Sequence, residues 1–212
     1  MTGHQRKRGR LVLATRNQGK VEEIKALLHD LPLEIISLDQ LAVIPEVKED
    51  QHTFSGNALK KARAVAAACG LPSLADDSGL TVDALGGRPG VFSSRYAGPG
   101  ADDAANNRLL LAELKGVPPE KRGAAFVCAL ALVIPGGETY LIEESCRGRI
   151  VETPQGQNGF GYDPLFFYEP AGQTFAQMET ALKNQVSHRG KALRRLKKLL
   201  ESMLLNRPSA NG

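Results

Sequence analysis

Apolar residues follow two different spacings along this chain, and the two spacings alternate. Some apolar runs are short and continuous, as in buried strands, whereas elsewhere the apolar residues recur at steps of three and four, as on one face of a helix. In the first third of the chain this pattern predicts strands at 11–14 and 33–36 and helices at 21–28 and 54–68. Strands that alternate with helices indicate an α/β fold.

The rest of the chain continues this alternation with a larger share of loops. We expect an extended acidic loop at 43–51, and a strand at 73–75 that ends at Asp76-Asp77-Ser78-Gly79. The pattern then predicts a helix capped by Asp102 or Asp103, a β-hairpin of 124–134 and 140–145, a strand at 165–167 and a last helix at 189–204.

Composition and charge indicate one folded domain with a basic leader. The chain has 212 residues, 42% of them hydrophobic, which is enough to bury one core. The net charge of +4 comes from four cations within the first ten residues, since the remainder has as many basic as acidic residues. We predict a disordered leader at 1–10, one domain at 11–204 and a disordered tail at 205–212. No stable nucleic-acid partner is expected for the folded part.

The cysteines indicate reduced thiols. Cys69, Cys128 and Cys146 are odd in number, lack the spacing of a metal site and lie in apolar contexts. No secretory signal precedes the first strand, and the longest apolar run, Phe126–Ile134, is too short to span a bilayer. We therefore expect a cytoplasmic protein with no membrane partner.

The junction between the first strand and the first helix predicts an anion site. Free backbone N–H groups at the helix start face the same point as the side chains of Thr15, Asn17 and Lys20. Such a site suits phosphate. It is not a P-loop, because the spacing Gly-x-x-x-x-Gly-Lys-Ser/Thr is missing. An ordinary strand-to-helix turn with a solvated Lys20 is the alternative.

The adjacent Asp76 and Asp77 predict a metal site. Two neighbouring carboxylates repel each other, and a hard cation such as Mg²⁺ would relieve the repulsion. Glu49, in the acidic loop, could supply a third oxygen ligand. The alternative is an aspartate-rich turn in which Asp77 or Ser78 caps the backbone.

Two further segments offer groups for a flat, polar ligand. Phe160 lies between glycines, so its ring could stack on a base; a core phenylalanine in a tight turn is the alternative. Ser187 is a good N-cap for the last helix, and His188 and Arg189 would place two cations there, a costly arrangement unless an anion arrives. The four segments together predict a site for a nucleoside triphosphate and its magnesium ion.

Six segments closely resemble, in order and spacing, those of the inosine triphosphate pyrophosphatase family: LATRNQGK, TFSGNALKKA, ADDSGL, GVFSSRYAG, GFGYDPLF and SHRGKAL. The resemblance runs from about Leu11 to Leu200. It implies a two-lobed α/β fold around a long mixed β-sheet flanked by helices, and a homodimer. The implied reaction is Mg²⁺-dependent hydrolysis of ITP, dITP or XTP to the monophosphate and pyrophosphate.

The resemblance also implies a role for each matching residue. Asp77 would be the catalytic base for the attacking water and, with Glu49, a ligand of Mg²⁺, while Asp76 would support this site. Phe160 would stack on the base. The other residues implied to bind substrate are Thr15, Asn17, Lys20 and Lys61 around the phosphates, Ser78, which would also support the metal site, Gly161 and Tyr162, and, around the base, Asp163, Lys183, Ser187, His188 and Arg189.

Two positions depart from the family pattern. Gln51 stands where a glycine commonly lies two residues after the metal-binding glutamate, so the departure falls in the loop that carries Glu49. Leu182 stands where a glutamate often precedes the Lys-Asn pair.

Two alternatives remain open at this point. A Maf-type nucleotide pyrophosphatase would share the architecture and reaction but prefer other nucleotides, and the segments GFGYDPLF and SHRGKAL argue against it. A nucleotide- or RNA-binding regulatory protein would use the basic leader and the basic residues of the last helix without catalysis. Asp76 and Asp77 argue against this second alternative, because carboxylates repel polyanions unless a metal intervenes.

Overall fold

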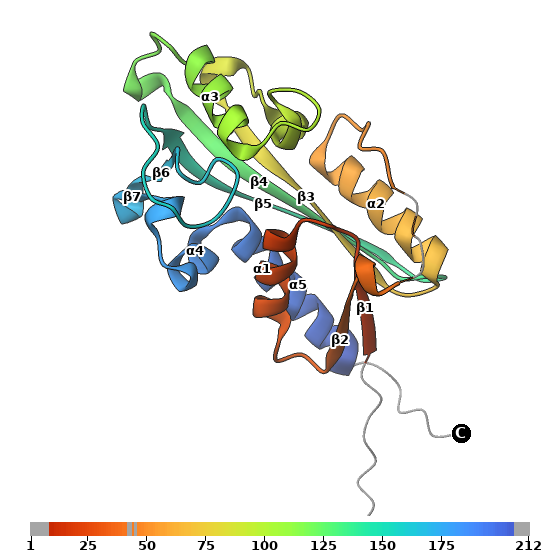
Figure 1. Ribbon diagram of the computed structural model, residues 1–212. Helices are drawn as coiled ribbons and strands as arrows, with labels where there is room; N and C mark the ends of the chain where they lie inside the picture. The colour runs from red at the N-terminus through yellow and green to blue at the C-terminus, as the bar shows by residue number, and fades with distance from the viewer. Residues whose placement is uncertain (1–8, 42–43, 45, 206–212) are drawn as a thin grey trace, which may run out of the picture.

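The computed structural model describes residues 9–41, 44 and 46–205, which build one seven-stranded mixed sheet with flanking helices (Figure 1). The strands are β1 Gly9–Leu13, β2 Leu33–Ser37, β3 Ser73–Val82, β4 Gly123–Val133, β5 Thr139–Ile150, β6 Phe166–Tyr168 and β7 Gln173–Thr174. The helices are α1 Gln18–Leu28, α2 Phe54–Cys69, α3 Asp103–Glu113, α4 Thr180–Val186 and α5 His188–Leu205. The expected α/β class is confirmed.

The order of the strands in the sheet is β2-β1-β3-β4-β5-β6-β7. Strand β1 pairs in parallel with β2 and β3, and every later pairing is antiparallel. The long strands β3, β4 and β5 run through the whole molecule, with α1, β1 and β2 at one end and α3, β6 and β7 at the other (Figure 1). This arrangement produces two lobes around a shared sheet, as the sequence resemblance implied.

The strand pleat sorts apolar side chains into separate cores, because successive side chains of a strand point to opposite faces. Leu11, Leu13 and Leu74 pack with α1 and α5 on one face of the sheet. Val12 and Ala75 pack with α2 on the other face. A third core fills the far lobe, where strands β3 to β6 meet α3.

Capping explains why α2 has these limits. The Thr53 side chain accepts a hydrogen bond from the Gly56 N–H at 3.0 Å, which satisfies one of the free donors at the helix start. Gly70 adopts a φ of 67° directly after the helix and donates its N–H to Ala66, an ending that glycine permits at low cost. The helix predicted at 54–68 is therefore confirmed, one residue longer.

Two local predictions were wrong. Asp76-Asp77-Ser78-Gly79 does not follow a strand end but lies in the middle of β3, because β4 pairs with this strand without interruption from Ser73 to Val82. The aspartate-rich turn is excluded for the same reason. Helix α4 was not predicted at all, because its seven residues are too few to display a clear apolar repeat.

Other boundaries shift by a few residues. Helix α1 begins at Gln18, and the hairpin strand β5 extends to Ile150. Strand β1 includes Gly9 and Arg10, which the predicted leader contained, while residues 1–8 and 206–212 lie outside the described part of the chain. Residues 43 and 45 of the expected acidic loop also lie outside it; the described residues 46–51 are extended without regular structure.

The basic residues of α5 mostly serve its packing. Arg194 donates to the carbonyl oxygens of Asn184 and Gln185 at 2.6 and 2.7 Å, and Lys191 donates to Ser145 O at 3.0 Å. Arg195 pairs with Glu144 of β5, and Lys197 pairs with Asp30, which follows α1.

Among the residues the structure describes, no helix combines the length and apolar character needed to cross a membrane.

Candidate active site

The predicted site residues gather around one cavity of about 360 Å³. Its walls come from the β1–α1 turn, the acidic loop, α2, β3, the loop at 159–163 and the start of α5. The predicted residues that line it are Thr15, Asn17, Lys20, Glu49, Lys61, Asp77, Ser78, Phe160, Gly161, Tyr162, Asp163, Lys183, His188 and Arg189. Asp76 and Ser187 do not line it; Ser187 instead caps α5, accepting from the Gly190 N–H at 3.1 Å.

The pleat of β3 separates the two aspartates that the sequence placed side by side. The side chain of Asp76 points to the face covered by α1 and α5, where it contacts Arg189. The side chain of Asp77 points to the opposite face, where it contacts Asn57 and Lys61 of α2. Among the described residues, no cation forms an ion pair with both carboxylates, so their mutual repulsion is not what would define a metal site.

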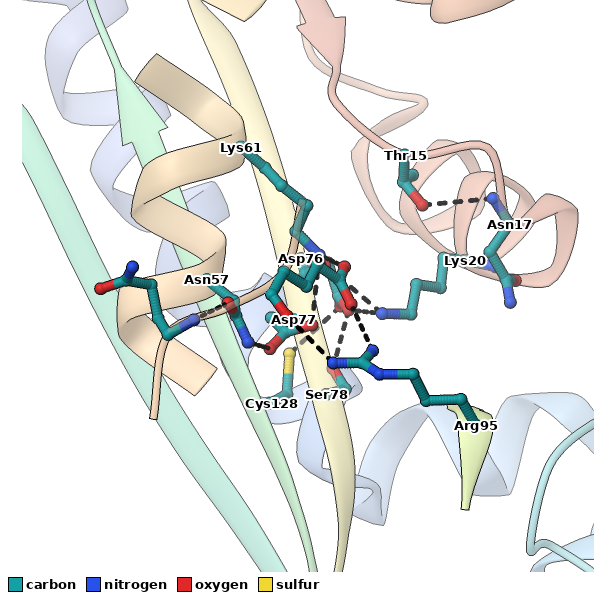
Figure 2. Close-up of polar contacts among 12 residues, drawn as sticks. Thr15, Asn17, Lys20, Asn57, Lys61, Asp76, Asp77, Ser78, Arg95 and Cys128 are labelled. Atoms are coloured by element: carbon teal, nitrogen blue, oxygen red, sulfur yellow. Dashed lines mark hydrogen bonds and ion pairs between the residues drawn. The ribbon is translucent and has the colours of Figure 1, made fainter. Parts of the chain in front are cut away.

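Asp76 is a fully buried structural anion. Its carboxylate accepts from Arg189 Nε at 2.8 Å. It also accepts from Ser78 Oγ at 2.8 Å and from Cys128 Sγ at 3.3 Å, and it forms an ion pair with Lys20 (Figure 2). Burial alone would raise the pKa of Asp76, but Arg189 and Lys20 outweigh burial and hold that pKa well below its ordinary value. Asp76 therefore stays ionised.

Asp77 and Glu49 converge on the Lys61 ammonium. Lys61 Nζ lies 2.6 Å from Glu49 Oε1 and 3.1 Å from Asp77 Oδ1, and it also donates to the backbone oxygen of Asp76. Figure 2 shows Lys20 and Lys61 reaching this point from opposite sides of the cavity. Burial raises the pKa of Asp77 above its ordinary value, because Lys61 and Lys20 compensate only part of the lost hydration and Glu49 adds repulsion.

This donor set fits a hard divalent cation. Two carboxylates already direct oxygen atoms at one positive group, and the burial cost carried by Asp77 would fall if a cation of higher charge approached. No group of three or more His, Cys, Asp or Glu in the described ranges could hold a metal. Magnesium suits such a two-carboxylate site, because it usually takes one or two carboxylates and completes its shell with water and phosphate oxygens.

Two residues that the sequence reasoning missed hold these acids in place. Asn57 is buried; its amide donates to Asp77 Oδ2 at 3.2 Å, and its oxygen accepts from the Gln51 N–H at 2.9 Å. Arg95 donates to Glu49 Oε2 at 3.3 Å and to the Glu49 backbone oxygen at 3.0 Å. Both lie in segments that carried the resemblance, TFSGNALKKA and GVFSSRYAG, so position within a motif was the available signal.

A second group of cavity residues combines an aromatic ring with buried charges. Phe160 lies with its ring 5.3 Å from Lys183 Nζ and 5.5 Å from the Arg189 guanidinium. Lys183 bonds Asp163 Oδ2 at 2.6 Å, and burial raises the pKa of Asp163. The cations of this segment are thus already paired, and they do not stand unneutralised at a helix start as the sequence suggested.

Glu23 of α1, which is not among the predicted site residues, neutralises Arg189 and Lys183. Its carboxylate lies 2.6 Å from Arg189 Nη1 and 3.3 Å from Lys183 Nζ. Burial opposes the charged form of Glu23, but Arg189 and Lys183 outweigh it and lower the pKa of this carboxyl. The only available signal was its position one helical turn after Lys20.

His188 is buried and neutral. Its ring stacks on Phe126 at 4.7 Å between centroids, and its Nδ1 has no hydrogen-bond partner among the described residues. Burial, together with the nearby Arg189, lowers the pKa of His188 well below its ordinary value. His188 also borders the cavity, so its neutral ring is placed to contact a ligand there.

The mixed sheet and the cations, carboxylates and aromatic ring around the cavity are typical of a nucleotide-binding enzyme. Comparison with known proteins gives the family of the chain. A profile of the Ham1 family matches residues 11–199, so the chain belongs to the Ham1 family. It is 55% identical over 188 residues to a dITP/XTP pyrophosphatase of Geobacter sulfurreducens, covering 89% of this chain and 94% of that protein. It is 48% identical over 191 residues to a dITP/XTP pyrophosphatase of Bacillus subtilis, covering 90% and 96%.

Solved structures agree with the family assignment. A HAM1 protein from Coxiella burnetii superposes with a TM-score of 0.85 at 40% identity, covering 92% of this chain and 99% of that one. The Ham1 protein of Staphylococcus aureus gives a TM-score of 0.83 at 38% identity, with the same coverage. The family resemblance inferred from the six segments is thereby confirmed.

Replacing Asp76 by Asn should destabilise the fold. The change leaves the Arg189 guanidinium buried with Glu23 as its remaining acid, so we expect a loss of about 3 kcal/mol in the free energy of unfolding, measured by urea denaturation. Glu144→Gln breaks the exposed pair with Arg195 and should cost less than ~1 kcal/mol. Equal losses for the two variants would contradict the structural importance of Asp76.

The stability of the protein should fall as the pH drops below about 6.5, the ordinary pKa of histidine. Because the folded state depresses the pKa of His188, the unfolded chain binds a proton there that the folded chain does not. This uptake lowers the free energy of unfolding by at most about 1.4 kcal/mol per pH unit. The free energy of unfolding, measured by denaturation between pH 7 and 5, should depend less steeply on pH in His188→Gln than in the unaltered chain. An equal dependence in the two proteins would contradict this role of His188.

Proposed function

We propose that this chain hydrolyses non-standard purine nucleoside triphosphates, such as dITP, XTP and ITP, to the monophosphate and pyrophosphate, and so removes them from the nucleotide pool. The observation that carries the proposal is that one cavity brings together two sets of groups. Lys20, Lys61 and two carboxylates suit a triphosphate with its metal ion, and an aromatic ring with His188 suits a base. The names of the relatives in Geobacter sulfurreducens and Bacillus subtilis support it.

The β1–α1 turn would bind the phosphates. Asn17 caps α1 by accepting from the Lys20 N–H at 3.0 Å, and Thr15 Oγ1 accepts from the Asn17 N–H at 3.2 Å (Figure 2). These bonds fix the turn, so the remaining N–H groups at the helix start face the cavity in a set direction. Lys20 and Lys61 would then neutralise the charge of the leaving pyrophosphate.

Glu49 and Asp77 would hold Mg²⁺. When bound, the ion would neutralise phosphate charge and polarise the phosphorus that is attacked. Asp76 would support this site indirectly, since its carboxylate keeps Lys20 and Arg189 in place from the other face of β3. Ser78, which donates to Asp76, shares that supporting role.

Asp77 would accept the proton of the attacking water. A general base is more effective when its proton affinity approaches the working pH, and burial shifts the pKa of Asp77 in that direction. Asn57 and Lys61 each bond one of its oxygens, which fixes the orientation of the carboxylate. Activity should accordingly decline as the pH falls through the pKa of this group.

Phe160 and His188 would recognise the base. The Phe160 ring would stack on the purine, and the neutral imidazole of His188, which borders the cavity, would donate a hydrogen bond to the 6-oxo group of hypoxanthine or xanthine. Adenine offers an amino donor at that position and would leave the imidazole donor unpaired, which a hydrogen-bonding pocket rejects strongly. Arg189 and Lys183, held by Glu23, would keep the Phe160 ring in place.

We also propose that the protein acts as a homodimer in the reducing cytoplasm.

The proposed reaction is tested by product analysis. The protein with Mg²⁺ should convert ITP to IMP and pyrophosphate, and XTP and dITP likewise, while ATP and GTP remain nearly intact; chromatography identifies the products. IDP and phosphate would contradict the proposed attack at the α-phosphate. Equal turnover of a pyrimidine nucleotide would favour the Maf-type alternative, and no turnover would favour a binding protein.

Asp77→Asn should lose activity by roughly 10²-fold or more, the scale typical of removing a general base. The melting temperature should not fall, because Asn removes a carboxylate whose charged form burial disfavours, while Lys61 keeps Glu49 as its partner. The matched control for ITP turnover is Asp50→Asn, which changes an exposed acid next to Glu49 in the acidic loop. Full activity in a folded Asp77→Asn protein would exclude Asp77 as the base.

A further inference from the structure

The loop at 159–163 is attached on its Asp163 side to the lobe that contains α1. Asp163 Oδ2 accepts from the Phe160 N–H at 3.0 Å and from Lys183 Nζ at 2.6 Å, and Lys183 also pairs with Glu23 of α1. The Phe160 ring itself rests on α1, since a Cβ atom placed on Gly19 would lie only 2.8 Å from two ring carbons. One side of the loop is therefore well fixed.

The other side of the loop is bound by α3, from the far lobe. Asp103 Oδ2 accepts from the Gly161 N–H at 2.6 Å, and Asn107 Nδ2 donates to the Gly161 carbonyl oxygen at 3.0 Å. Asp103 and Asn107 are four residues apart and lie on the same side of the helix, so one helical turn engages both polar groups of a single glycine. Asp103 also borders the cavity.

Helix α3 is a firm support for these two bonds. Leu110 is fully buried in the core of the far lobe. Asn106 accepts from the Ala97 N–H at 2.8 Å and donates to Ser94 O at 3.3 Å. The first turn of α3 is capped by Asp102, which accepts from the Ala105 N–H at 2.7 Å.

Two features indicate that the bonds to Gly161 serve more than stability. Asn107 Oδ1 is buried without a hydrogen-bond partner in the described part of the chain, an arrangement that is unfavourable for folding. Phe160 also lies between Gly159 and Gly161, with φ of 76° and 65°, and such glycines leave the free loop many conformations. External bonds to Gly161 would restrict that freedom.

We propose that Asp103 and Asn107 are positioning residues that fix the Gly161 peptide groups and so hold the Phe160 ring in the orientation that receives the purine. The proposal rests on the proposed function, in which this ring stacks on the base. It predicts that α3 contributes to the affinity for the nucleoside part of the substrate and not to the affinity for its phosphates.

The test compares Asp103→Ala with Asp103→Asn and with Asp102→Ala. In Asp103→Asn the amide oxygen of the new side chain can still accept from the Gly161 N–H, whereas alanine cannot. Asp102→Ala removes the cap of the same helix without touching the loop, so it is the matched control for loss of helix stability. Two measurements are made: amide hydrogen exchange at 159–163 without nucleotide, and calorimetric binding of IMP and of pyrophosphate with Mg²⁺.

Asp103→Ala should speed exchange at Gly161 and weaken IMP binding by roughly tenfold, the loss of one charge-assisted hydrogen bond, with pyrophosphate binding unchanged. Asp103→Asn should keep most of the IMP affinity. Asp102→Ala should lower the melting temperature but change neither amide exchange at 159–163 nor the binding of IMP. Should Asp103→Ala fail to fold, Asn107→Leu replaces it. This variant removes both the bond and the unpaired oxygen, so it should weaken IMP binding without lowering the melting temperature.

Unchanged exchange at Gly161 in Asp103→Ala would overturn the proposal, and so would equal weakening of IMP and pyrophosphate binding. Loss of IMP binding in Asp102→Ala of the same size as in Asp103→Ala would also overturn it, because a general effect of helix stability would then suffice. If the unaltered chain bound pyrophosphate but not IMP, the proposed function would fail, while the exchange measurement would still decide whether α3 fixes the loop.

Discussion

The buried ion pair between Arg189 and Asp76 is the interaction on which the geometry of the site depends. It joins α5 to β3, and Glu23 and Lys20 extend it to α1. A buried charge is tolerated only when oppositely charged partners lie at short distance. These elements therefore cannot move apart without leaving a buried charge unpaired. The ion pair therefore sets the distance between the β1–α1 turn and the start of α5.

The pleat of β3 then gives two neighbouring aspartates different properties. Asp76 meets two cations on its face, and its pKa is lowered; Asp77 shares one cation with Glu49 on the opposite face, and burial raises its pKa. One carboxylate thus organises the structure, while the other has a raised affinity for a proton. Because the pairing of β3 with β4 continues past both residues, this assignment to faces is fixed by the register of the sheet.

The two groups of cavity residues differ in how they are held. Lys20 belongs to a capped helix start and Lys61 belongs to α2, so both cations come from regular elements with set directions. Phe160 lies in a loop with glycines on either side, and this loop takes its conformation from contacts with α3 and with Lys183 of α4, which pairs with Glu23 of α1. The position of the aromatic ring therefore depends on three helices.

The sequence by itself determined the alternation of strands and helices, the Thr53 and Ser187 caps, and most of the residues around the cavity, because these depend on local spacing and on six ordered motifs. Only the tertiary structure decided that Asp76 and Asp77 lie inside a strand and face opposite ways. The same is true of the neutralisation of Arg189 by Glu23, 166 positions away. Such pairings follow from strand register and helix docking, which bring together residues whose separation along the chain leaves no periodic signal.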